Sequence, residues 1–68
     1  MATIDSVLQD TYGVTVFNAP PVALIWAAEF MAQRDGIATA KRELSEANRR
    51  RDKAGKPLAH VDFGHPLF

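Results

Sequence analysis

The chain has 68 residues and no Cys, and its eight Lys or Arg balance eight Asp or Glu to give a formal net charge of zero. This length allows at most one small domain, and the lack of Cys excludes disulfide frameworks, thiolate zinc sites and cysteine nucleophiles. The charge is unevenly divided, since residues 1–36 carry four acids and one base while residues 37–68 carry four acids and seven bases, and the balanced total gives no general nucleic-acid footprint.

The first predicted element is a short helix over residues 4–12. Thr3 is a typical N-cap, Asp5 lies in the first turn where the helix dipole favours a carboxylate, and Gly13 suits the position after the last turn. The apolar residues fall at helical spacing and form one stripe, at Ile4, Val7, Leu8 and Tyr12. This helix therefore has one face to bury.

Residues 14–17, Val-Thr-Val-Phe, have the β-branched and aromatic composition of a short strand. No hairpin partner follows directly, so the strand would need cover from elsewhere, and residues 59–63 are the candidate partner. The prediction for this segment is extended structure or a strand.

A long helical region is predicted over residues 21–53. It begins where Pro20 and Pro21 fit a first turn, and its first part is apolar on nearly every side. Gly36 either breaks this region into two helices or lies within one continuous helix, and we favour a break or kink. Beyond Gly36 a narrow apolar seam has the 3-4-3 spacing of a heptad, at Ile37, Ala40, Leu44 and Ala47.

The final predicted element is an extended docking tail over residues 57–68. Gly55 and Pro57 end the preceding helix, and the remaining segment is too short and too proline-bounded for another helix. Its apolar residues are expected to pack on the helices of this chain or on a neighbouring protein. The predicted fold class is thus mainly α, as a single domain spanning residues 1–68.

No group of residues has the pattern of a catalytic, cofactor or metal site. His60, Asp62 and His65 are the one cluster of candidate metal ligands, but their spacing matches no familiar site, and we interpret them as a polar edge of the tail. Glu29 lies among apolar turns without a nucleophile or a base partner. Ser6 and Ser45 have no His neighbour in the sequence. We therefore predict a protein that is not an enzyme and holds no cofactor or metal.

The apolar surplus of the chain predicts a protein interface. A helix that is apolar all round needs apolar neighbours on every side, and a chain of this length offers few. The predicted interface residues are the large apolar side chains of this helix and of the tail: Val22, Leu24, Ile25, Trp26, Phe30, Met31, Leu58, Val61, Phe63, Leu67 and Phe68.

An alternative interpretation rests on residues 30–51. Ala32, Gly36 and Ile37 resemble a helix-turn-helix with a basic second helix over residues 37–53, although Arg42 stands where that motif places an apolar residue. This resemblance implies a nucleic-acid-binding or regulatory protein. The candidate phosphate-binding residues are Arg49, Arg50, Arg51 and Lys53.

The leading hypothesis is a structural or interaction subunit of a larger protein assembly, such as a minor accessory protein of a viral particle or of a multisubunit complex. Its expected partners are other protein subunits, in a homo- or hetero-oligomer. A small inhibitor of a host enzyme is a third hypothesis, which the charge asymmetry allows. No signal peptide or membrane-spanning run is visible, so a soluble protein of the cytoplasm or of a particle is expected.

Overall fold

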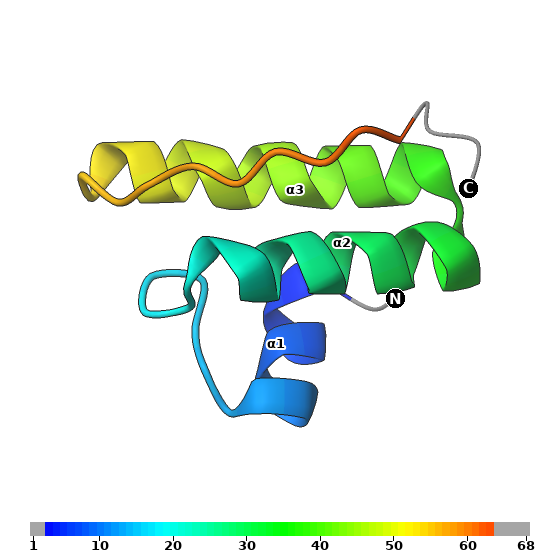
Figure 1. Ribbon diagram of the computed structural model, residues 1–68, viewed down its shortest axis with the longest axis horizontal. Coiled ribbons are helices and arrows are strands. Elements are labelled where there is room, and N and C mark those ends of the chain that lie inside the picture. Colours follow the sequence, from blue (N-terminus) through cyan, green and yellow to red (C-terminus); the bar gives the residue numbers. More distant parts are fainter. Residues whose placement is uncertain (1–2, 64–68) are drawn as a thin grey trace.

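The computed structural model describes residues 3–63 and is mainly helical, as the sequence predicts. Three helices follow one another, α1 over Ile4–Tyr12, α2 over Pro21–Asp35 and α3 over Ile37–Lys53. Helices α2 and α3 lie side by side and antiparallel, α1 projects from α2, and the segment after α3 runs back along it (Figure 1). The molecule measures 31 × 22 × 18 Å along its principal axes.

Helix α1 is fixed at both ends by the residues that the sequence singles out. Thr3 and Ser6 form a reciprocal capping box, and Gly13 ends the helix in the left-handed conformation with φ of 67°. Helix α3 secures the N-terminus further, because the Glu43 carboxylate accepts a 2.9 Å hydrogen bond from the backbone N–H of Ile4. The carboxylate of Asp5 also accepts a 2.9 Å bond from Arg50 of α3, which raises the pKa of that guanidinium.

The predicted strand at residues 14–17 is not found, and residues 3–63 contain no strand. Thr15 and Asn18 instead close a turn: the Thr15 N–H donates to the Asn18 Oδ1 over 2.7 Å, and the Asn18 N–H donates to the Thr15 Oγ1 over 3.2 Å. Local bonds of this kind between side chain and backbone compete with strand pairing. The turn buries Val16 and leads directly into α2.

The break at Gly36 is confirmed, and this single residue joins α2 to α3. Its φ of 99° and ψ of 153° lie in a region that is essentially restricted to glycine. The reversal brings the small side chains of the two helices together, and Ala28 of α2 and Ala40 and Ala47 of α3 are fully buried. The alanine content thus allows the helices to approach closely.

We expect Gly36→Ala to lower the free energy of unfolding by about 1–2 kcal/mol through backbone strain. No atom lies within 4 Å of the position that an added Cβ would occupy, so the loss would come from the dihedral angles and not from a clash. Urea denaturation followed by circular dichroism measures the change. Unchanged or increased stability of the variant would contradict this explanation of the reversal.

Candidate protein-interaction surface

The core of the molecule accounts for most of the apolar character of α2. Its buried residues face α1 on one side and α3 on the other, and they comprise Ala23, Leu24, Ala27, Ala28, Met31 and Ala32. The accessible surface of 4229 Å² matches the roughly 4,250 Å² expected for a compact monomer of 7.5 kDa. The apolar surplus that the sequence suggests is therefore largely covered by the chain itself.

One face of α2 remains uncovered. Val22, Trp26 and Phe30 follow one another every fourth residue along this face, with 68%, 36% and 39% of their surface exposed. Tyr12 extends the face from the end of α1 and is 49% exposed. We call these four residues, Tyr12, Val22, Trp26 and Phe30, the Trp26 strip.

The aromatic side chains of the Trp26 strip hold one another in place. Trp26 and Phe30 stack with ring centroids 5.3 Å apart and an angle of 14° between their planes. Tyr12 meets Trp26 edge-on at 5.6 Å and 86°. The guanidinium carbon of Arg34 lies 4.9 Å from the centroid of Phe30, while its Nη2 atom is 3.0 Å from the Asp35 carboxylate. Contacts of this kind each contribute about 0.5–1.5 kcal/mol, so the rings are ordered before any partner arrives.

The structure separates the predicted interface residues into three groups. Leu24, Met31 and Phe63 are buried in the core, and Ile25 and Val61 are partly buried against it. Val22, Trp26, Phe30 and Leu58 are exposed. Leu67 and Phe68 lie outside the described residues. Tyr12 is the strip residue that the sequence analysis assigned to the buried stripe of α1, because helical spacing alone does not show that a helix end passes beyond its neighbour.

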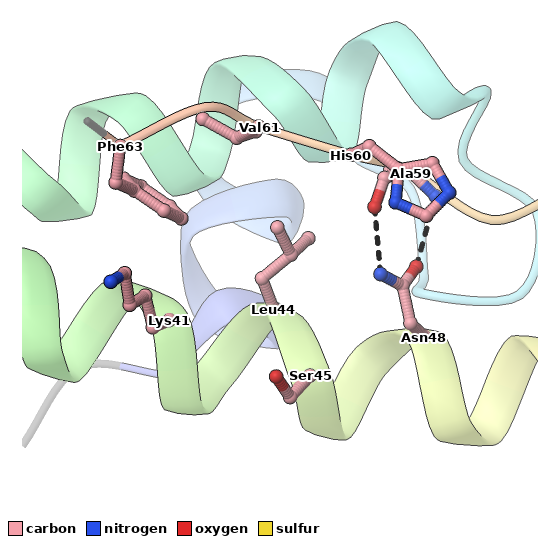
Figure 2. Close-up of a pocket in the computed structure, with 8 residues that line it drawn as sticks. All are labelled: Lys41, Leu44, Ser45, Asn48, Ala59, His60, Val61 and Phe63. Atoms are coloured by element: carbon pink, nitrogen blue, oxygen red, sulfur yellow. Dashed lines mark hydrogen bonds between the residues drawn. The ribbon is translucent and has the colours of Figure 1, made fainter. Parts of the chain in front are cut away.

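The tail packs on the chain's own helices as far as it is described. The Asn48 side chain holds the backbone of Ala59 twice: its amide donates to the carbonyl over 2.7 Å, and its oxygen accepts from the N–H over 3.0 Å (Figure 2). An open groove of about 300 Å³ lies between this segment and α3. Its lining includes Lys41, Ser45 and His60, while Phe63 closes one end (Figure 2).

The candidate phosphate-binding residues are not available as a cluster. Arg51 is 1% exposed, and Arg49 and Arg50 form ion pairs with Glu46 and Asp5. Lys53 is exposed. Helices α2 and α3 also run antiparallel (Figure 1), whereas the two helices of a helix-turn-helix cross at roughly 90–120°. The geometry therefore differs from the motif that the sequence resembles.

Arg51 is the residue whose role the sequence analysis missed. Its Nε donates to the carbonyl of Pro57 over 2.8 Å, and its Nη1 donates to the carbonyls of Val16 and Ala19 over 2.9 and 2.6 Å. One buried side chain thus joins α3 to the loop before α2 and to the tail. The signal was present, because position 51 continues the seam of Ala40, Leu44 and Ala47 with the next heptad step.

The remaining candidates for chemistry have structural surroundings. Ser6 belongs to the capping box of α1, and Glu29 is half-buried on α2. His60 and Asp62 are exposed, and His65 lies outside the described residues. Within residues 3–63 no three His, Asp or Glu side chains come together as a group that could hold a metal ion.

No helix in the described part of the chain is both long and apolar enough to cross a membrane. Comparison with protein-family models, curated proteins and solved structures finds no match. Functional argument for this chain therefore rests on its own surface, of which the Trp26 strip is the most distinctive part.

Proposed function

We propose that this protein is a non-enzymatic interaction subunit of a larger protein assembly and that it binds a partner protein through the Trp26 strip. The observation that supports this proposal is the exposure of three stacked or edge-packed aromatic rings beside Val22 on one face of the molecule. Tyr and Trp are enriched among the residues that dominate the energy of protein interfaces. Contiguous exposed apolar residues also mark interaction sites on soluble proteins.

The ordered state of the strip adds to the argument. A side chain that must be immobilised on binding costs about 0.5–1.5 kcal/mol. Trp26 and Phe30 are already fixed by their stacking and by Arg34, so little of this cost remains to be met when a partner binds. Such preorganisation is typical of a binding surface.

Site-specific photo-crosslinking in the native source tests the proposal. A photoreactive amino acid at position 22 should give one discrete product with a partner protein, because Val22 is the most exposed residue of the strip. The same group at position 53, on the exposed end of α3, is the matched control and should give no such product. A product at position 53 alone, or no product at position 22, would contradict the proposal.

We further expect Val22→Gln to weaken partner binding by about tenfold or more while changing the free energy of unfolding by less than about 0.5 kcal/mol. Gln has good helix propensity, and the side chain it replaces is 68% exposed, so the fold has little to lose. Titration of the crosslinked partner against both proteins measures the first quantity, and urea denaturation measures the second. Equal affinity of the two proteins would place the interface elsewhere.

A further inference from the structure

The charges beside the Trp26 strip have one sign once the ion pairs are removed. On α1 and α2, Asp5 is paired with Arg50 of α3, and Arg34 is paired with Asp35. Asp10 and Glu29 remain, and neither has an ion pair among the described residues. Glu29 follows Trp26 by three positions and therefore lies on the same face of α2. The α1 C-terminus, next to Tyr12, adds the negative end of a helix dipole.

The spacing of the strip suits a helical partner. Val22, Trp26 and Phe30 form a ridge at every fourth residue of a regular helix of 15 residues. Ridges of this kind interdigitate with the side chains of a second helix. An amphipathic helix laid along a groove or ridge is a common mode of peptide recognition.

A second copy of this chain fits the surface poorly. Pairing of the strip with itself across a two-fold axis would bring the Glu29 carboxylates of both copies to the same interface, and like charges without compensation destabilise such a contact. The basic outer side of α3 offers little apolar surface, because its one exposed large apolar residue in the described chain is Ile37 at the helix start. Neither arrangement matches both the apolar and the charged parts of the strip.

We infer that the occupant of the Trp26 strip is a basic amphipathic helix of another protein, with an apolar face flanked by Lys or Arg. The apolar face would cover Val22, Trp26 and Phe30, and the flanking cations would face Glu29 and Asp10. This inference rests on the proposed function and specifies the chemistry of the partner.

The test uses two synthetic helical peptides without Trp that share one Leu and Ala face and carry either Lys or Glu at the flanking positions. Trp26 is the sole Trp of the chain, so its fluorescence reports contact with the strip directly. The Lys peptide should shift the emission to the blue and bind about fivefold to tenfold more tightly than the Glu peptide, as two surface charge pairs allow. This preference should fade as salt is raised.

Matched variants identify the charges responsible. The combined change Asp10→Asn and Glu29→Gln should remove the preference for Lys while leaving binding through the apolar face. Asp52→Asn removes an exposed acid from α3 instead and should leave the preference intact. Circular dichroism checks that each variant keeps its helices.

The remaining outcomes each count against the inference. Equal binding of both peptides through Trp26, or preference for the Glu peptide, would overturn it but leave the proposed function standing. A shift with lipid vesicles and not with peptides would favour a membrane surface, and a shift that grows with protein concentration alone would favour a second copy. Failure of both peptides would overturn the inference while crosslinking at position 22 still succeeds, and failure of both tests would remove the proposed function too.

Discussion

Replacement of Arg51 by Met should lower the free energy of unfolding by about 3–5 kcal/mol, the largest effect that we expect from any single substitution in this chain. The guanidinium is buried and donates to three backbone carbonyls, those of Val16, Ala19 and Pro57. Hydrogen bonds from a charged donor each contribute about 1.5–3 kcal/mol. A domain of this length has a total stability of roughly 3–10 kcal/mol, so the variant would be largely or wholly unfolded.

An apolar replacement cannot compensate at this position. Buried ion pairs are sometimes replaced at no cost when both partners become apolar. Here the partners of Arg51 are backbone carbonyls, which no substitution removes, and they would remain in the core without donors. Arg51→Lys keeps the charge but not the planar arrangement of donors, and we expect it to recover only part of the stability.

Urea denaturation followed by Trp26 fluorescence and by circular dichroism measures these changes. Arg49→Ala is the matched control, since Arg49 lies two residues away, is exposed and pairs only with Glu46 at the surface. Its free energy of unfolding should change by less than about 1 kcal/mol. Similar losses at positions 49 and 51 would show that the buried hydrogen bonds of Arg51 are not what stabilises the fold.

The local elements could be predicted from the sequence because their signals are local. Capping by Thr3, the left-handed Gly13 and the reversal at Gly36 each depend on the backbone preferences of a few neighbouring residues. The turn at Thr15 was missed although it is also local, because the β-branched residues around it favour a strand equally well. Its side-chain hydrogen bonds with Asn18 decide the outcome.

The distribution of burial around α2 could not be predicted, because it depends on where α1 and α3 cross it. The sequence shows a helix that is apolar on nearly every side, and both a fully buried helix and a helix with one interface face fit that pattern. Arg51 was misassigned for a similar reason. It belongs to a run of three arginines that looks like a solvated helix end, and only the return of the tail over α3 encloses it.

The second large effect is expected at Asn48, whose side chain attaches the tail to α3. Its amide replaces a strand partner for Ala59, donating to the carbonyl and accepting from the N–H of the same residue. Ala59 is buried, so Asn48→Ala would leave two buried backbone groups unpaired, at about 1–3 kcal/mol each. We expect a loss of about 2–4 kcal/mol, or release of the tail if the exposure of its apolar residues costs less.

Amide hydrogen exchange distinguishes these two results. In the wild-type protein the Ala59 N–H should exchange slowly, and Asn48→Ala should accelerate it together with the amides of the neighbouring tail residues. If the tail alone is released, the amides of Leu8 and Leu24 in the core should keep their protection, because α1 and α2 do not depend on Asn48. Asn48→Asp is the matched variant: it keeps the acceptor for the Ala59 N–H but removes the donor and places a carboxylate beside a carbonyl oxygen. It should therefore be no more stable than Asn48→Ala, whereas wild-type exchange in either variant would show that the tail is held by its apolar contacts alone.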